Sequence, residues 1–276
     1  MTRLDRRLLF TSGAAAALLA AAGLAPERAP RSGGRLRIAV PRDDSLAAVE
    51  SGAIFERLTE VAPDGSLRPE LATAWKGSED ARRWQFTLRD GVHFHDGRPL
   101  TAADAVESLR SRPLPERVLR LEATGSNRIL VELAAGNPDL PYWLADPGLV
   151  VTPEGGDGSA GIGTGPYRLQ GRRTGRQFLG TRVAHHYKDG EAAWAESVEV
   201  IAIPDAGVRA EALRDGYVDI AALPRPEGLR GRGSFVYHPG EDRIALAARA
   251  GVGMPRVVGS RGALDDGRIA LRWWLA

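Results

Sequence analysis

The sequence predicts an α/β protein, and three stretches of the chain carry this prediction. Residues 198–203 have the pattern of a strand, residues 204–214 that of a helix and residues 218–220 that of a further strand, which is the order of an α/β unit. Residues 84–88 alternate apolar and polar side chains with the period of two that is typical of a half-buried strand. Thr101 precedes a segment with one apolar helical face, as a helix N-cap residue does.

In the first half of the chain, short periodic segments alternate with turn residues. Apolar residues at a period of two indicate strands, near-helical spacing indicates helices, and Asp-Gly pairs indicate hairpin turns. The expected elements are a strand over residues 35–41, a helix over 47–58, strands over 84–88 and 92–95, a helix from Thr101 to residue 109, a hairpin over 118–131 and a short helix over 138–144.

In the second half, the glycine-rich residues 154–165 (EGGDGSAGIGTG) are the best candidate for a boundary between two lobes. In the helix expected at 204–214, Val208, Ala212 and Leu213 are assigned to the buried face. The elements expected in this half are a hairpin between residues 167–169 and 177–179, strands over 198–203 and 218–220, and helices over 204–214 and 265–276. The last helix carries Trp273 and Trp274, two large apolar side chains that are expected to be buried.

The first 25 residues are set apart by their composition. Three arginines occur within the first seven residues, and residues 8–25 (LLFTSGAAAALLAAAGLA) are apolar and rich in alanine. This order is typical of an export signal, and paired arginines before a weakly hydrophobic core predict the twin-arginine type. A membrane anchor is the alternative, but about 18 residues are marginal for spanning a bilayer. We expect a cleaved signal over residues 1–25 and a flexible leader over residues 26–34.

The charge balance predicts no strongly charged partner such as nucleic acid. The chain has 37 basic and 35 acidic residues, and removal of residues 1–25 takes away three arginines and one aspartate, which leaves 34 of each. A near-neutral protein exerts no general attraction on polyanions. The sequence also contains no cysteine, which excludes disulfides and thiolate metal sites.

Two histidines and an aspartate stand together in the stretch HFHD. His93 and His95 would project from the same face of a short strand, as two metal ligands could, and Asp96 follows directly. A further ligand at a workable spacing is missing from the sequence around them. We interpret the stretch as part of the scaffold. An exported metal-dependent hydrolase that uses His93, His95 and Asp96 is one alternative.

Other patterns that resemble chemical sites have a simpler interpretation. Residues 161–165 (GIGTG) resemble a phosphate-binding loop, but Pro166 and Tyr167 follow where such a loop needs the start of a helix, so a crossover between lobes fits better. Carboxylate pairs such as Asp43-Asp44 are common in turns, and most of the six tryptophans are expected in the core. The sequence shows neither a nucleophile triad nor a Walker lysine, so we expect neither enzyme activity nor a cofactor.

Several of these stretches, in this order, resemble the dipeptide-, oligopeptide- and nickel-binding proteins of ABC importers, which are family 5 of the substrate-binding proteins. Strong similarity covers about residues 34–224. The matching segments are residues 54–109, which resemble the family's most characteristic block, residues 163–169 (GTGPYRL), residues 198–224 with their G-x-x-D-I strand, and more weakly residues 264–276, which resemble the start of a D-x-R-x-x-x-A-L helix.

The resemblance implies a periplasmic-binding-protein-like fold of type II, cluster C. It assigns residues 35–54 and 163–250 to an incomplete α/β lobe I, residues 55–162 to a small strand-rich lobe II, and residues 251–276 to the start of a further lobe that is largely missing. Because family members are usually much longer, we interpret the chain as a truncated or divergent member.

The same resemblance implies a protein that binds and does not catalyse. Its ligand would be a peptide or related small solute outside the cytoplasm, its partner an ABC permease, and its contact with the membrane only through that permease. The candidate ligand contacts are Asp43 and Ser45, after the first strand, and Arg243 and Ala245 near a later strand. The second alternative is a remnant that docks another protein through an uncovered face and takes no part in transport.

Overall fold

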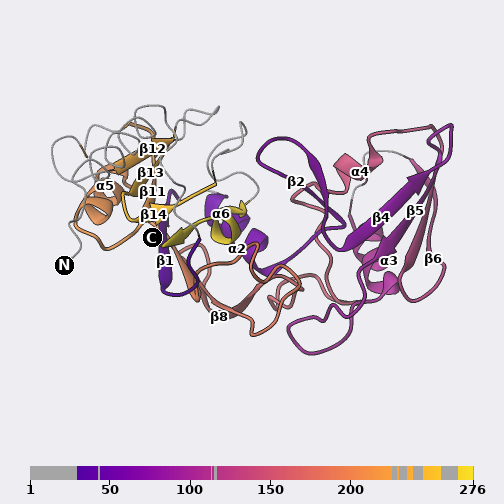
Figure 1. Ribbon diagram of the computed structural model, residues 1–276, viewed down its shortest axis with the longest axis horizontal. Coiled ribbons are helices and arrows are strands. Elements are labelled where there is room, and N and C mark those ends of the chain that lie inside the picture. The colour runs from indigo at the N-terminus through magenta and orange to yellow at the C-terminus, as the bar shows by residue number, and fades with distance from the viewer. Residues whose placement is uncertain are drawn as a thin grey trace, which may run out of the picture.

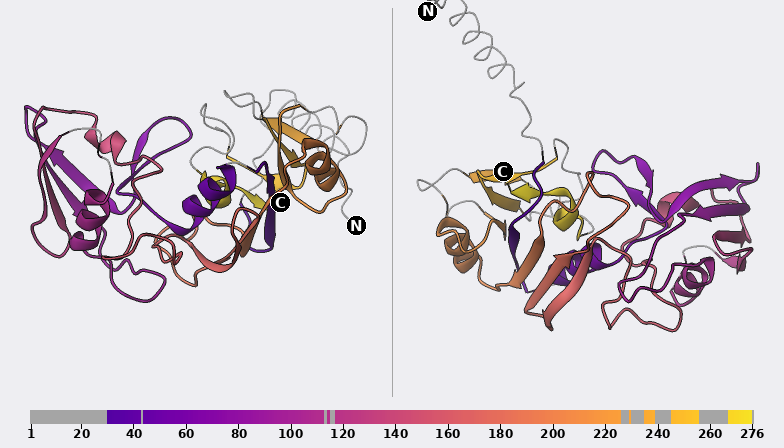
Figure 2. Two further views of the ribbon diagram at one scale, coloured as in Figure 1. Left: turned by 180° about the vertical axis from the view of Figure 1, so that it is seen from behind. Right: turned by 60° about the horizontal axis from the view of Figure 1, so that its bottom comes forward.

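The computed structural model describes residues 30–275 except residues 43, 113, 115–116, 226–228, 230–234, 239–244 and 256–266. The described chain forms two bodies, each built on one large sheet and joined by crossing segments (Figure 1). We call the part with the seven-stranded sheet the first body and the part with the four-stranded sheet the second body. The view from behind in Figure 2 shows the same separation.

The first body is a mixed sheet in the strand order β12-β13-β11-β1-β10-β9-β8. The central strand β1 is parallel to both of its neighbours, whereas the outer pairs are antiparallel. Its elements are β1 (Arg35–Val40), α2 (Ser45–Ile54), β8 (Tyr167–Arg173), β9 (Gln177–Arg182), β10 (Ser197–Ala202), α5 (Ala206–Arg214), β11 (Ile220–Leu223), β12 (Phe235–His238), β13 (Ala245–Arg249), α6 (Ile269–Arg272) and a small pair of strands, β14 (Val252–Gly253) and β15 (Trp274–Leu275).

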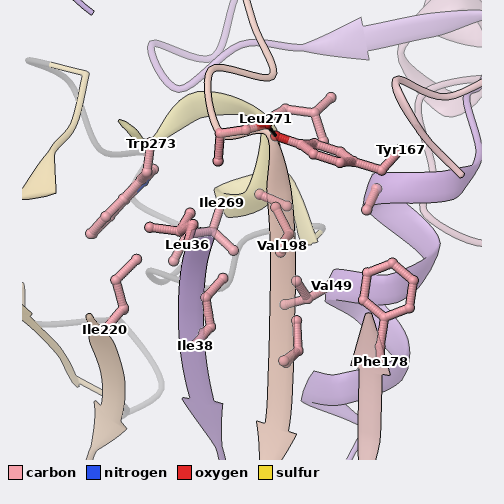
Figure 3. Packing of buried hydrophobic residues seen from close by; sticks show 14 of the residues in the cluster. Leu36, Ile38, Val49, Tyr167, Phe178, Val198, Ile220, Ile269, Leu271 and Trp273 are labelled. Carbon is pink, nitrogen blue, oxygen red and sulfur yellow. Dashed lines mark hydrogen bonds between the residues drawn. The ribbon is translucent and has the colours of Figure 1, made fainter. Parts of the chain in front are cut away.

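The alternation of side chains along β1 gives the sheet an apolar layer on each face. Leu36, Ile38 and Val40 belong to a core cluster that includes α2 and α6, while Ala39 belongs to a smaller cluster with α5 on the opposite face. Figure 3 shows Leu36, Ile38 and Val49 of α2 within the larger cluster. Complete burial of one such side chain contributes about 1.5–3 kcal/mol, so these two layers hold α2 and α5 against the sheet.

The second body is an antiparallel sheet in the order β4-β5-β7-β6, covered by two helices. The predicted alternation in β5 is confirmed, because Trp84, Phe86 and Leu88 are buried. Between the two bodies, β2 and β3 form a separate hairpin. The bounds of these elements are β2 (Thr59–Val61), β3 (Leu67–Pro69), β4 (Ala72–Gly77), β5 (Arg83–Leu88), α3 (Ala102–Arg110), β6 (Val118–Ala123), β7 (Arg128–Leu133) and α4 (Leu140–Trp143).

The predicted N-cap of α3 at Thr101 is confirmed, and the structure adds a reciprocal bond from Asp104. The backbone N–H of Asp104 donates to the Thr101 hydroxyl oxygen (3.4 Å), and the backbone N–H of Thr101 donates to the Asp104 carboxylate (2.8 Å). The other carboxylate oxygen of Asp104 accepts a hydrogen bond from the backbone of Glu154 (2.9 Å). The cap therefore also fixes the chain that returns toward the first body.

The first and last predicted helices differ from the observed ones. α2 ends at Ile54 and not at residue 58, because Phe55 is extended and leads the chain toward the second body. The helix expected over residues 265–276 is only the short α6 within its described part. Trp273 is extended, so that Trp274 can pair with Gly253 in β14–β15. Trp273 and Trp274 are buried, as they were expected to be.

Two further expectations were wrong in detail. Val208 is half exposed instead of buried, because Asp205 caps α5 and the resulting register turns Arg209, Ala210 and Leu213 inward. The strand expected over residues 92–95 is reduced to one isolated bridge between His93 and Pro99.

The two crossing segments lie against each other without room for a side chain. The backbone N–H of Gly165 donates to the carbonyl oxygen of Ile54 (2.8 Å). A Cβ atom on Gly165 would lie 2.6 Å from the carbonyl oxygens of Ala53 and Ile54, and one on Gly163 would overlap the same Ile54 oxygen. The GTG sequence is thus required by close backbone approach where the chain returns to the first body.

Replacing Gly163 or Gly165 by alanine is therefore expected to destabilise the protein. Overpacking of this kind costs about 1–3 kcal/mol and occasionally more, and here the obstructing atoms are backbone. Gly125→Ala is the matched control, since a Cβ atom there meets nothing within 4 Å. Urea unfolding of the three variants measures the effect. Equal free energies of unfolding for Gly163→Ala and Gly125→Ala would contradict the proposed contact.

Candidate functional site

The carboxyl ends of β1 and β10 form the edge at which a ligand site is expected in an open α/β sheet. β1 leads into α2 on one face of the sheet, and its parallel neighbour β10 leads into α5 on the opposite face. Ligands commonly bind outside the carboxyl ends of strands where the chain connections diverge in this way. We call this edge the switch-point edge.

The structure brings two of the four predicted contact residues to the switch-point edge. Ser45 is the first residue of α2, just beyond the loop that follows β1. Ala245 begins β13 and pairs in register with Leu223, the last residue of β11. Because β11 runs parallel to β1, both strands end at this edge. Asp43 and Arg243 lie outside the described residues.

A buried arginine that sequence reasoning missed holds the same edge together. The Arg209 guanidinium donates to the carbonyl oxygens of Ala222 at the end of β11 (2.6 Å) and of Ile203 just after β10 (2.5 Å). It also donates to Pro204 (2.9 Å). Hydrogen bonds from a charged donor contribute about 1.5–3 kcal/mol each. The helix register could have revealed Arg209. The sequence analysis assigned Val208 to the buried face of this helix, whereas the residue that follows it, Arg209, is the buried one.

His95 fixes the returning crossing segment through the backbone of the GTG sequence. Its Nε2 atom lies 2.7 Å from the carbonyl oxygen of Gly165, and the backbone N–H of Gly163 donates to its Nδ1 atom (3.4 Å). Nε2 is therefore the protonated nitrogen. Burial is the main cause that lowers the pKa of His95, which favours this neutral form. Both ring nitrogens are used for the scaffold.

The HFHD stretch does not assemble a metal site. The ring of His93 is exposed and lies 2.9 Å from the carbonyl oxygen of Gly91 through Nδ1, while Asp96 bonds to Arg98. Within the part of the chain that the structure describes, no three His, Cys, Asp or Glu side chains are close enough to share a metal ion.

A network of buried charges joins the start of the second body to the C-terminal segment. The Glu70 carboxylate is fully buried and accepts from Lys188 Nζ (2.7 Å) and from Arg268 Nη2 (2.7 Å), as well as from the backbone N–H of Arg57 (2.9 Å). We call these residues, together with Glu56, Glu60 and Arg272, the Glu70 cluster.

The other members of the Glu70 cluster extend it between the two bodies. Glu60 accepts from Lys188 (3.2 Å) and from Arg272 (3.0 Å). The Tyr187 hydroxyl donates to Glu56 (2.6 Å), whose carboxylate also lies 3.5 Å from Lys188 Nζ. Lys188 thus stands among three carboxylates.

Mutual attraction keeps these buried groups charged. Burial alone raises the pKa of Glu56, but Lys188 and then His186 outweigh it, and the pKa is lowered from 4.5 to about 2. Burial lowers the pKa of Lys188, yet Glu70, Glu60 and Glu56 together raise it above its usual value. Glu56 and Lys188 are therefore held as paired charges at neutral pH.

A cleft of about 820 Å³ opens beside the Glu70 cluster and is lined from both bodies. Arg89 follows β5 of the second body, whereas Trp194 and Trp274 belong to the first body. Neither Ser45 nor Ala245 lines it. The cleft is consequently a place distinct from the switch-point edge.

Comparison with known proteins identifies the family. The family model described as "Bacterial extracellular solute-binding proteins, family 5 Middle" matches residues 66–232, which is more than half of the chain. The chain belongs to this family. The predicted resemblance is thereby confirmed, and the proteins of this family are binding proteins.

Two curated relatives and one solved structure illustrate the match. This family 5 protein is 30% identical over 195 residues to the nickel-binding periplasmic protein of Escherichia coli (strain K12), covering 64% of the chain and 36% of the relative. It is 28% identical over 228 residues to the probable di/tripeptide-binding protein 5 of Pseudomonas aeruginosa (strain UCBPP-PA14), covering 66% and 42%.

The structure of the periplasmic binding protein DppA from Helicobacter pylori, in complex with the peptide STSA, superimposes with a TM-score of 0.66 at 21% identity. The match covers 76% of this chain and 51% of that one. The predicted periplasmic-binding-protein fold is confirmed. The chain spans about one third to one half of the length of the proteins it matches. None of the described helices has the length and apolar character needed to cross a membrane.

Glu70→Gln is expected to lower the free energy of unfolding by about 3–5 kcal/mol. The substitution removes the buried carboxylate that Lys188 and Arg268 share, and breaking a buried ion pair by removing one partner carries a cost of this size. Glu122→Gln is the control, because its pair with Arg120 (2.7 Å) is solvent-exposed and such pairs contribute about 0–1 kcal/mol. Urea unfolding compares them, and similar losses for both would refute a special role for Glu70.

The contribution of Glu56 to stability is expected to disappear in acid. The pKa of Glu56 is about 2 in the folded protein and 4.5 in the unfolded chain. The stabilisation is therefore complete above pH 4.5 and is lost as the pH falls toward 2. The raised pKa of Lys188 matters in alkaline solution. The contribution of Lys188 to stability is complete below pH 10.5 and is lost as the pH rises through the pKa of Lys188 in the folded protein. The measurement is the difference in unfolding free energy between the wild type and Glu56→Gln, taken from pH 7 down to pH 3. A difference that stays constant over this range would contradict the assignment.

Proposed function

We propose that this family 5 protein binds a peptide or a related small solute outside the cytoplasm and delivers it to an ABC permease without transforming it. We also propose that residues 1–25 are a twin-arginine export signal. Residues 35–54 with 163–250 then form lobe I, and residues 55–162 form lobe II. Because the matched relatives extend well beyond this chain, the solute, the permease and the place of export are inferences from the shared family.

The observation that carries this proposal is the switch-point edge in a member of a solute-binding family. The edge combines the loop after β1, the first turn of α2 and the start of β13. Ligands commonly bind outside such an edge, where the loops that leave the strand ends place polar groups around a small solute. Arg209 keeps the strand ends in fixed positions, so the edge is preorganised.

The relatives support two classes of ligand to be tested first. One relative is named as nickel-binding and another as a probable di/tripeptide-binding protein. The HFHD stretch favours neither class, because His95 is committed to the backbone of the GTG sequence. The predicted contacts Asp43 and Ser45 carry oxygen acceptors, which suit a peptide amine better than a metal that requires nitrogen ligands.

Calorimetric titration of the exported protein with a panel of di- and tripeptides and with nickel chloride tests the proposal. We expect saturable binding of peptides, weakened at least tenfold in the double variant Asp43→Ala, Ser45→Ala, because a charged acceptor contributes about 1.5–3 kcal/mol. The control Asp64→Ala, Ser66→Ala removes the same two residue types at the same spacing from an exposed turn. No saturable binding of either class would sink the proposal and favour a protein-interaction module.

A further inference from the structure

The wall of the cleft between the two bodies carries more positive than negative charge. The charged residues that line it are four cations, Arg68, Arg89, Lys188 and Arg272, and two carboxylates, Glu60 and Glu191.

Two of the four cations are already balanced by the Glu70 cluster. Lys188 contacts Glu70 and Glu60, and Arg272 contacts Glu60 and the carbonyl oxygen of Val61. These pairs leave Lys188 and Arg272 little capacity for an additional anion. The charge that is available for a ligand therefore lies with Arg68 and Arg89.

Arg89 is held in a defined position without a carboxylate partner among the described residues. Its guanidinium carbon lies 4.1 Å from the centre of the Tyr187 ring, and its Nε donates to the backbone carbonyl of Glu70 (3.4 Å). A guanidinium that stacks on an aromatic ring presents its outer N–H groups in the plane that matches a carboxylate. Arg89 is partly buried, so it is preorganised to receive an anion.

The surroundings of Arg89 fit a ligand with an apolar body. Tyr187, Trp194 and Trp274 contribute aromatic walls. Arg68 stands on the β2–β3 hairpin, and among the described residues the charged partner of its side chain is the exposed Asp64 (3.6 Å). An exposed pair of this kind is weak and is readily exchanged for a ligand carboxylate.

We propose that this cleft is a second binding site, which takes a small molecule with one carboxylate and an aromatic or aliphatic body. The carboxylate binds Arg89, with Arg68 as the outer contact, and the body lies against the aromatic walls. The site goes beyond the proposed function, because it shares no described residue with the switch-point edge.

The test uses hippurate, a benzoylated glycine, and hippuramide, which has the same shape without the charge. Tryptophan fluorescence and calorimetry follow binding to the full protein, since Trp194 and Trp274 line the cleft. Wild type is expected to bind hippurate at least tenfold more tightly than hippuramide. Arg89→Gln should abolish this difference. Arg83→Gln, at the start of β5 where Arg83 pairs with Glu132, should retain it.

Two further measurements decide the remaining cases. Asp43→Ala, Ser45→Ala should leave hippurate binding unchanged, which separates this site from the switch-point edge. If Arg89→Gln does not fold by circular dichroism, the exposed Arg68→Gln decides, with an expected loss of at least threefold. Equal affinities for hippurate and hippuramide in wild type, or unchanged hippurate binding in the folded arginine variant, would overturn the proposal.

Discussion

The structure depends on the burial of one carboxylate, that of Glu70. Its oxygens accept hydrogen bonds from three separate parts of the chain: the backbone of Arg57, the ammonium of Lys188 and the guanidinium of Arg268. A buried carboxylate without such partners would be strongly destabilising. The native fold therefore requires all three segments to contact Glu70 at the same time. The close approach of the GTG backbone to Ile54 and the two bonds of His95 then fix the crossing segments beside it. The position of one body against the other follows from these contacts.

Local features of this fold could be predicted because their causes lie within a few residues. The alternation in β5, the N-cap at Thr101 and the crossover role of the GTG sequence all depend on neighbouring side chains or on the absence of a side chain. The Glu70 cluster could not be predicted in this way. Lys188 and Arg268 stand 118 and 198 residues away from Glu70, and no local pattern marks these residues as partners.

The candidate site shows the same division between local and distant causes. Ser45 was proposed as a contact on the resemblance to family 5, and in the structure it begins α2 at the switch-point edge. The edge lies between chain connections to opposite faces of the sheet because β1 pairs with both β10 and β11. This strand order could not be predicted from local patterns. Arg209 was missed for a smaller reason, because a one-residue error in helix register exchanges a buried arginine for an exposed valine.

The two proposed sites differ in what they could do to the arrangement of the bodies. The described residues of the switch-point edge all belong to the first body, so they would hold a ligand to that body. A ligand in the cleft would contact Arg89 of the second body and Trp194 of the first body at once. A ligand shifts the equilibrium between two arrangements of the bodies only if it binds one arrangement more tightly than the other. Such a difference arises when the ligand contacts both bodies, because those contacts change with the angle between the bodies. Of the two, the cleft is therefore the place from which a small carboxylate would act on the angle between the bodies.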